Sequence, residues 1–400
     1  MKKILLIGLG VLVSGIILGQ PLDINLLKAR ACMDQNKIDS ALRILTSVQG
    51  SQPNYVLDLW LGDCYFHKAD LKKASHFYLL ADSLNKGSSS YELSCIYAKQ
   101  NNKNKAIDWL EKYLATPNKK TELDIRRDSS FRSISSSPEW KTCWTKDWYS
   151  ESETEENAVN ALLSKGKASE AMSELESYED KFSPRHKYFY LQAKIYEKQH
   201  LLAPALAVME KAITFNSFSD DYLALYADLL KDNKKYNDAL DYINKAIRIN
   251  PYHSLYYLKR GEIARLAGNY KQAEKDLRMY KDLYPENLDT YHQLGLLESS
   301  QGNNQNAMEF YDILLTKDRT NAQYFVERGS IALTIEQIQK ADEDFSLALD
   351  LNPNNQEAYL KKGNTLRILN DQEGACFYWS EAKRLGSSEA AKLMYQNCKN

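Results

Sequence analysis

An alanine recurs at one fixed spacing through the second half of the chain. From Ala171 to Ala375 an alanine stands at every 34th position. A strict period of this length is typical of a solenoid, in which one supersecondary unit is repeated and packs against its neighbours. The period therefore predicts an elongated repeat protein. The series is Ala171, Ala205, Ala239, Ala273, Ala307, Ala341 and Ala375.

Residues 254–287 show what one repeat contains. Apolar residues at spacings of three and four mark a face of a first helix, which Gly268 ends. A second apolar face follows, and Pro285 blocks further helix. We expect Gly261 and Ala273 to lie where the two helices cross, because larger side chains there would push the helices apart. The two faces consist of Tyr257, Gly261 and Ala264, and of Tyr270, Ala273, Leu277 and Tyr280.

This pattern resembles the tetratricopeptide repeat family, whose signature is a helix-turn-helix of about 34 residues. Six adjoining units between residues 186 and 389 keep the register, and looser units lie nearer the N-terminus. The resemblance implies an all-α fold, an α–α superhelix of about ten helix-turn-helix repeats.

The period breaks once, because the distance from Ala106 to Ala171 falls short of two full periods. Phe131, Trp140 and Trp144 lie in the interval, which resembles the closing segment found after many tetratricopeptide arrays. We predict an N-terminal array of about three repeats over residues 20–120, and a capping segment with an acidic junction over 121–157. A second array of about seven repeats follows over 158–389, with a capping helix over 390–400. One continuous superhelix with a distorted middle is the alternative.

The N-terminus has the order of a secretory signal. Lys2 and Lys3 precede an apolar run from Ile4 to Leu18, and Gly19 ends it. The run is shorter than the roughly 20 residues that span a bilayer. We predict a signal peptide over residues 1–19 and a periplasmic protein. An uncleaved anchor is the alternative, and it is the one case in which we expect membrane association.

Six cysteines enter an oxidising compartment if the chain is exported. We predict a disulfide bond between Cys376 and Cys398, because a final helix should fold back on the last repeat. Two unpaired thiols are the alternative. Cys32, Cys64 and Cys95 lie on inward or near-inward helix positions and are expected to be free and buried. The ending around Cys376 resembles that of many exported repeat proteins from Bacteroidota.

The sequence contains no motif that indicates chemistry. There is no phosphate-binding loop, no zinc-protease helix and no Cys-x-x-Cys pair. The net charge of -1 does not suggest nucleic acid as a partner. We therefore predict that the protein is not an enzyme and has no catalytic residue, no metal site and no cofactor.

The family resemblance implies where a partner sits, because the first helix of each unit lines a concave groove. The lining has mixed charge and several apolar groups, which suits an extended peptide or a helix of another protein. Ordinary solvated helix faces are the alternative for any single position. Among the tyrosines, Tyr190, Tyr222 and Tyr256 lie nearest the groove side. The mapped residues are Tyr190, Lys194, Glu197, Asp228, Lys231, Leu258, Glu262, Arg265, His292, Leu296, Ser299, Val326, Ser330, Leu360, Asn364 and Arg367.

These observations together predict a non-catalytic scaffold of the bacterial cell envelope that binds other proteins in its groove. A role beside a secretion or assembly machine is one specialisation, and it rests on family habit. A self-associating structural protein, with a repeat face as the homo-oligomer surface, is a second alternative.

Overall fold

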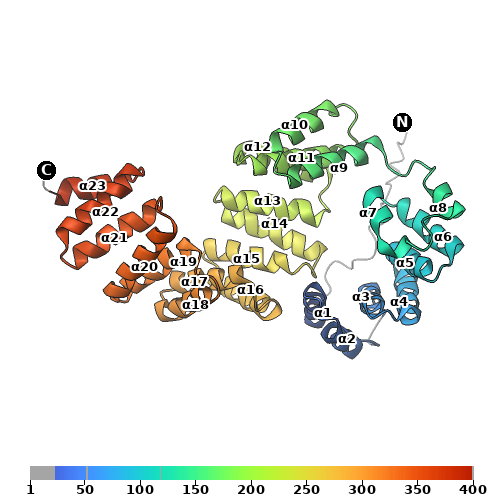
Figure 1. Cartoon of the computed structure of the whole chain (residues 1–400), viewed down its shortest axis with the longest axis horizontal. Helices are drawn as coiled ribbons and strands as arrows, with labels where there is room; N and C mark the ends of the chain where they lie inside the picture. Colours follow the sequence, from blue (N-terminus) through green and yellow to red (C-terminus); the bar gives the residue numbers. More distant parts are fainter. Residues whose placement is uncertain (1–22, 51–52, 118, 399–400) are drawn as a thin grey trace, which may run out of the picture. The chain divides into compact units, whose positions relative to one another are not determined.

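A computed structural model describes residues 23–50, 53–117 and 119–398, and these residues form helices and no strand (Figure 1). The all-α solenoid predicted from the period is confirmed. The predicted signal peptide lies outside the described residues. Among the helices that the structure does describe, none has both the length and the apolar character that crossing a membrane requires.

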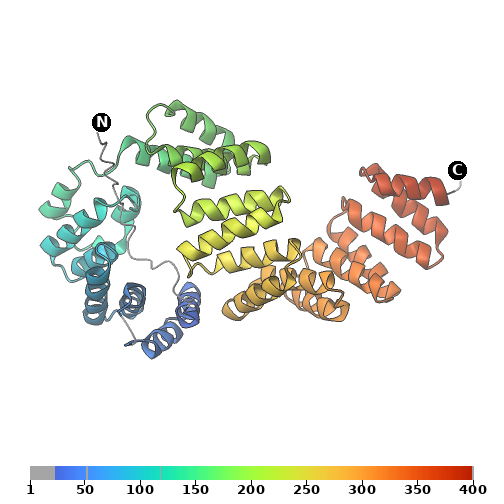
Figure 2. The ribbon, with the colours of Figure 1, turned by 180° about the vertical axis from the view of Figure 1, so that it is seen from behind.

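The described part of the chain divides into two compact units, one that ends at Tyr256 and one that begins at Tyr257. Within each unit, consecutive helices pair side by side, as the two opposite views show (Figures 1 and 2).

Unit 1 opens with three helix pairs, continues with three short elements and closes with three more pairs. The first pairs are α1 (Ile24–Asp34) with α2 (Ile38–Ser47), α3 (Tyr55–His67) with α4 (Leu71–Leu84), and α5 (Ser90–Lys99) with α6 (Lys103–Leu114). The short elements are α7 (Glu122–Arg127), the 3-10 helix η1 (Ser129–Phe131) and α8 (Pro138–Cys143). The later pairs are α9 (Glu151–Ser164) with α10 (Ala168–Ser177), α11 (Arg185–Lys198) with α12 (Leu202–Phe215), and α13 (Asp220–Asp232) with α14 (Tyr236–Ile249).

Unit 2 begins within α15 (Leu255–Leu266) and continues the alternation of first and second helices. Its other elements are α16 (Tyr270–Leu283), α17 (Leu288–Ser300), α18 (Asn304–Lys317), α19 (Ala322–Thr334), α20 (Ile338–Leu351), α21 (Gln356–Ile368), α22 (Gln372–Arg384) and α23 (Ser388–Asn397).

The two helices of a repeat cross at a glycine that has no room for a side chain. A Cβ added to Gly261 would lie 2.8 Å from Leu277, as the sequence predicted for this crossing. In every such pair the large residue stands 16 positions after the glycine, on the second helix. Because the helices meet so closely, the large side chain covers the glycine and fills the space beside it. The other pairs are Gly62 with Tyr78, Gly295 with Tyr311, Gly329 with Phe345, and Gly363 with Trp379.

Repeats that lack the glycine have a smaller partner at the same place. The residue at the glycine position is Ala193 or Ala227, and Met209 or Ile243 stands 16 positions later. All four of these residues are fully buried. An aromatic ring at this crossing therefore stands opposite glycine, whereas an aliphatic side chain stands opposite alanine or, as Leu277 does, opposite glycine.

Two crossings in unit 2 also contain a buried ion pair. Arg260 donates two hydrogen bonds to the carboxylate of Asp276, at 2.7 and 2.8 Å, and the Asp276 side chain is fully buried. Arg328 binds Asp344 in the same way, at 2.9 and 2.6 Å. Each arginine directly precedes the glycine, and each aspartate directly precedes the large residue. Two parallel hydrogen bonds satisfy a carboxylate that burial would otherwise destabilise.

The segment after α6 covers the third repeat with aromatic side chains. Phe131 and Trp140 are buried and lie 5.1 Å apart between ring centroids, and Trp144 lies 5.6 Å from Trp140. They pack into one apolar cluster with α5 and α6. Phe131 and Trp140 thus have the packing role expected of a capping segment.

The acidic residues of the predicted junction lie in a helix. We expected a polar connection up to residue 157, but α9 already begins at Glu151. Ser150 and Glu153 form a capping box, in which each side chain accepts a hydrogen bond from the other residue's backbone N–H. Carboxylates in the first turn also interact favourably with the positive end of the helix dipole. The acidic run therefore starts a helix.

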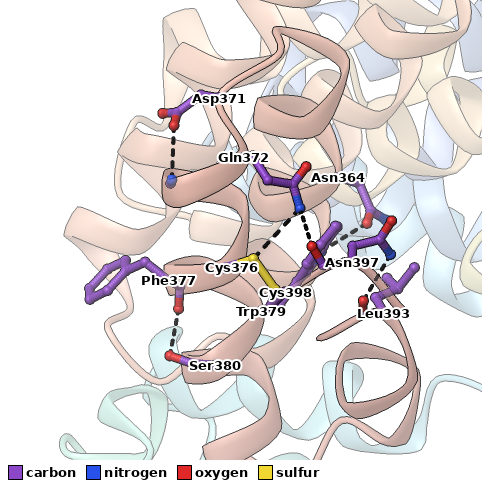
Figure 3. Close-up of a disulfide and its surroundings, with 11 residues drawn as sticks. Asn364, Asp371, Gln372, Cys376, Phe377, Trp379, Ser380, Leu393, Asn397 and Cys398 are labelled. Carbon is purple, nitrogen blue, oxygen red and sulfur yellow. Dashed lines mark hydrogen bonds between the residues drawn. A yellow bond between two sulfur atoms is a disulfide. The ribbon is translucent and has the colours of Figure 1, made fainter. Parts of the chain in front are cut away.

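The C-terminal helix α23 is fastened to the last repeat. The Ser387 hydroxyl caps it by accepting from the Ala390 N–H at 3.1 Å, and Leu393 and Met394 pack around Trp379. The structure pairs Cys376 of α22 with Cys398 in a disulfide bond, with their Cα atoms 5.8 Å apart (Figure 3). The chain end is thus held both by apolar packing and covalently.

Glu92, on α5, is a carboxyl group that the fold holds in an unfavourable environment. Burial is the main cause that raises its pKa to about 7, and the nearby Asp63 adds to the effect. A carboxyl whose pKa rises on folding stabilises the protein while it stays protonated.

The glycine crossings predict how unit 2 responds to a single added methyl group. Gly295→Ala should lower the free energy of unfolding by about 1–3 kcal/mol, because its Cβ would overlap Tyr311. Tyr311→Ile should also destabilise the protein on its own. The double variant, which copies the Ala227–Ile243 pair, should lose at least about 1 kcal/mol less than the sum of the two. Denaturant unfolding of the four proteins measures this, and strictly additive losses would contradict the crossing.

The raised pKa of Glu92 predicts that the stability of the protein depends on pH. Its contribution should be full below about pH 4.5 and be lost as the pH rises through about 7, because the folded protein holds this proton more tightly. Glu92→Gln should therefore exceed the parent protein in stability at pH 8, by on the order of 2 kcal/mol. The two proteins should be similar at pH 4.5. Unfolding curves of both proteins at pH 4.5 and pH 8 test this prediction. If the difference in the free energy of unfolding between the two proteins is the same at both pH values, the pKa of Glu92 is not raised in the folded protein.

Candidate functional site

The first helices of neighbouring repeats are joined by their side chains. In unit 1, hydrogen bonds and ring contacts link α9 with α11 and α11 with α13. We call the six residues that make these links the unit 1 strip. They are Glu156, Asn160, Lys187, Tyr190, Lys194 and Tyr222.

Two lysines connect α11 to α9. The Lys194 Nζ donates a hydrogen bond of 2.8 Å to the side-chain oxygen of Asn160, and the Lys187 Nζ donates one of 2.8 Å to Glu156. Lys187 and Glu156 both keep about a quarter of their side-chain surface exposed. Burial lowers the pKa of Lys194, although Glu156 and Glu197 oppose that effect. These charges are thus held in place and still reachable from the surface.

Two tyrosines connect α11 to α13. The rings of Tyr190 and Tyr222 are stacked, with centroids 4.2 Å apart and planes 20° from parallel. The His186 Nδ1 lies 3.0 Å from the Tyr222 hydroxyl oxygen. Burial raises the pKa of both tyrosines, so both hydroxyls are neutral donors at neutral pH. Tyr222 is buried and Tyr190 is half-buried, so the exposed part of the stack is the Tyr190 ring. This ring lies beside polar groups, a combination that is common at protein interfaces.

A polar hollow of about 430 Å³ adjoins one end of the strip. Lys119, Glu153 and His186 line it, together with Glu156 and Lys187 of the strip itself. Lys119 forms an ion pair with Glu153. The hollow and the strip therefore form one charged, nearly balanced surface.

The other predicted residues of unit 1 lie on the same two helices. Glu197 is half-buried on α11, and Asp228 and Lys231 are half-buried on α13. The Lys231 Nζ lies 3.8 Å from the carboxylate of Asp232. Their placement on first helices is the one that the family pattern implied.

Unit 2 has links of the same kind between its first helices. The Arg265 Nε of α15 donates to the side-chain oxygen of Gln293 on α17, at 3.3 Å. The His292 Nε2 of α17 lies 2.6 Å from a carboxylate oxygen of Glu327 on α19. Burial alone would raise the pKa of Glu327, but the contact with His292 outweighs it, so this pKa is lowered. We call these four residues the unit 2 strip.

Gln293 and Glu327 were absent from the sequence prediction. Each of them directly follows a predicted groove residue: Gln293 follows His292, and Glu327 follows Val326. The sequence did contain a signal for Glu327. It follows the position that is one 34-residue period after His292, and its charge is opposite to that of a protonated histidine. Two predicted residues of α15 and α17, Glu262 and Leu296, are half-buried.

Asn364, a predicted groove residue, also takes part in packing. Its side-chain oxygen accepts a hydrogen bond of 3.0 Å from the Trp379 indole N–H (Figure 3). This bond fixes the ring that covers Gly363, within the last repeat. Asn364 therefore supports packing in the last repeat. Arg367, at the end of α21, is exposed.

The buried thiols lack the properties of reactive cysteines. Cys64, Cys95 and Cys143 are free and buried, and burial raises the pKa of Cys64 and Cys95 to about 12 and of Cys143 to about 11. A thiol with such a pKa carries almost no thiolate, the reactive form, at neutral pH. Within the residues that the structure covers, no group of three or more His, Cys, Asp or Glu side chains could hold a metal ion.

Models of the tetratricopeptide repeat family match four segments of the chain. One matches residues 226–287, and a second matches residues 87–116, 288–314 and 322–355. Three of these segments contain helices that carry the crossings described above, and the fourth, residues 87–116, contains α5 and α6, which pack against the aromatic residues of the capping segment.

Two curated proteins show partial sequence similarity. The small glutamine-rich tetratricopeptide repeat-containing protein 2 of Saccharomyces cerevisiae is 29% identical over 96 residues, which are 24% of this chain and 28% of that protein. The Homo sapiens protein O-mannosyl-transferase TMTC1 is 25% identical over 167 residues, which are 41% of this chain and 19% of that protein. The chain thus spans less than a third of the length of either relative.

Two solved structures share the fold. A tetratricopeptide repeat protein from Parabacteroides merdae aligns with a TM-score of 0.52 at 17% identity, covering 62% of this chain and 98% of its own. The Cut9–Hcn1 hetero-tetramer of the APC/C aligns with a TM-score of 0.54 at 14% identity, covering 94% of this chain and 83% of the matched chain. The matched segments are thus tetratricopeptide repeats, and the described residues share the fold of a solved tetratricopeptide repeat protein.

Proposed function

We propose that the protein is a non-catalytic scaffold that binds another protein, or an extended peptide segment of one, along the unit 1 strip. Proteins made of such repeats generally act through extended concave surfaces. The observation that carries the proposal is the continuity of the strip across α9, α11 and α13. A partner that runs across the helices would meet charged groups at Lys187 and Lys194 and an aromatic surface at Tyr190.

The composition of the strip indicates the chemistry of the partner. Lys187 and Lys194 are already held by Glu156 and Asn160, so a partner carboxylate would add to an ordered set of donors. The exposed part of the Tyr190 ring, backed by the buried Tyr222, would receive an apolar or aromatic side chain. We therefore infer a partner segment that carries both an acidic and an apolar residue.

We further propose that the protein is exported to the periplasm of a bacterium of the Bacteroidota type and works in the cell envelope. The N-terminal sequence supports export, and the disulfide between Cys376 and Cys398 fits an oxidising compartment. A place beside a secretion or assembly machine is the specialisation that we propose within that compartment. Retention by an uncleaved N-terminal helix and self-association are the alternatives.

The binding proposal predicts that partner capture depends on the charge of the strip. Lys194→Glu should reduce capture of a specific envelope protein at least about tenfold, because it reverses a charge held beside Glu156. Lys245→Glu is the matched control, since Lys245 is an exposed lysine on the second helix α14. Quantitative mass spectrometry after mild crosslinking measures the capture. Equal capture by both variants would contradict a site on the strip, and a dimer as the sole product would support self-association.

The export proposal predicts the N-terminus and the thiol content of the native protein. N-terminal sequencing of protein from the envelope fraction should begin at Gln20, and a start at Met1 would support the anchored alternative. Denatured protein should show four free thiols before reduction and six after it. Six free thiols before reduction would contradict an oxidising location.

A further inference from the structure

Two aromatic side chains from distant parts of unit 1 meet at an unexpected contact. Trp60, on α3, packs edge-on against Tyr252, which lies in the turn after α14, with ring centroids 5.5 Å apart. Tyr252 also packs against the apolar cluster formed by the first two repeats. The first two repeats thus contact the turn that ends the sixth helix pair of the same unit.

Both residues are exceptions to the repeat pattern. The position of Tyr252 holds polar residues in the later repeats, and the position of Trp60 holds polar or charged residues in most of them. Each aromatic residue therefore departs from the polar residues that most repeats have at its place. The polar equivalents of Tyr252 are Glu286, Thr320 and Asn354, and those of Trp60 are Glu92, Lys259, Gln293, Glu327 and Lys361.

The repeat before Tyr252 supplies an internal comparison. Phe218 occupies the same turn position one period earlier, and 63% of its surface is exposed. Tyr252 is half-buried, and burial raises the pKa of its hydroxyl, with Asp23 and Tyr55 adding to the effect. Trp60 is 7% exposed. Two aromatic residues at equivalent turns therefore differ because one of them is covered by the first repeats.

Both sides of the contact are held firmly. The Arg30 guanidinium lies 5.9 Å from the centre of the Trp60 ring, so α1 and α3 both take part. On the other side, the Asn250 side-chain N–H donates to Asp220 at 2.9 Å, and the Tyr256 hydroxyl donates to the same carboxylate oxygen at 3.0 Å. These bonds fasten the turn to α13. A hollow of about 350 Å³ lies at the contact, lined by Arg30, Trp60, Tyr252 and His253 among others.

We propose that Trp60 and Tyr252 form a clasp that closes unit 1 on itself in solution. The curvature of a solenoid is the sum of small rotations between its repeats. A contact between the second repeat and the end of the sixth helix pair therefore fixes the total rotation that the repeats between them accumulate. The clasp holds the unit 1 strip in one curvature, and this last step rests on the binding function proposed above.

Hydrogen exchange tests the clasp on the full chain. Tyr252→Ser removes one of the two aromatic rings of the clasp. Because Tyr252 lies in a turn, the substitution leaves every repeat crossing unchanged. Amide exchange in α1 and α3 should become roughly threefold to tenfold faster, as expected for the loss of an aromatic pair. Phe218→Ser is the matched control and should leave α1 and α3 unchanged. In the opposite direction, Trp60→Leu should speed exchange at residues 250–254.

The outcomes separate the clasp from local effects and from the proposed function. Unchanged exchange in α1 and α3 of Tyr252→Ser would overturn the clasp, as would an equal effect of Phe218→Ser. Neither variant alters a residue of the strip, so the exchange result stands whether or not a partner is captured. Failure of Lys194→Glu to reduce capture would refute the binding site and leave the clasp intact.

Discussion

The close crossing of two helices at a glycine is the constraint on which the rest of this structure depends. Gly295 and Tyr311 illustrate it: the ring occupies the space that any side chain on the first helix would need. Where alanine replaces glycine, as at Ala227, the partner is the smaller Ile243. This size matching sets the distance between the helices of a repeat. Since the same matching recurs in register, each repeat presents the same faces to its neighbours.

The two strips follow from that stacking. Because the first helices lie next to one another, Lys194 reaches Asn160 and Tyr190 stacks on Tyr222, each across a repeat boundary. The crossings use the inner face of each first helix and leave another face for these links. The crossings within repeats and the links between repeats therefore use different residues. Asn364 is an exception, because it lies at a predicted groove position and also accepts a hydrogen bond from Trp379 within its own repeat.

The sequence predicted the features that repeat and missed those that do not. The crossing at Gly261, the capping role of Phe131 and Trp140, and the packing of the last helix all follow from periodic or local patterns. The partnership of His292 with Glu327 needed knowledge of which first-helix positions face the next repeat. The Trp60–Tyr252 contact could not be predicted, because it joins two residues outside the periodic pattern and depends on the accumulated curvature of several repeats.

The central claim is that the unit 1 strip binds a partner protein. Site-specific photocrosslinking in the native cell tests it most directly, with a photoreactive amino acid placed at Tyr190 on the strip or at Lys245 on the second helix α14. The account predicts a discrete crosslinked partner from position 190 and none from position 245. A partner crosslinked from position 245 but not from position 190 would place binding on another surface and contradict the account.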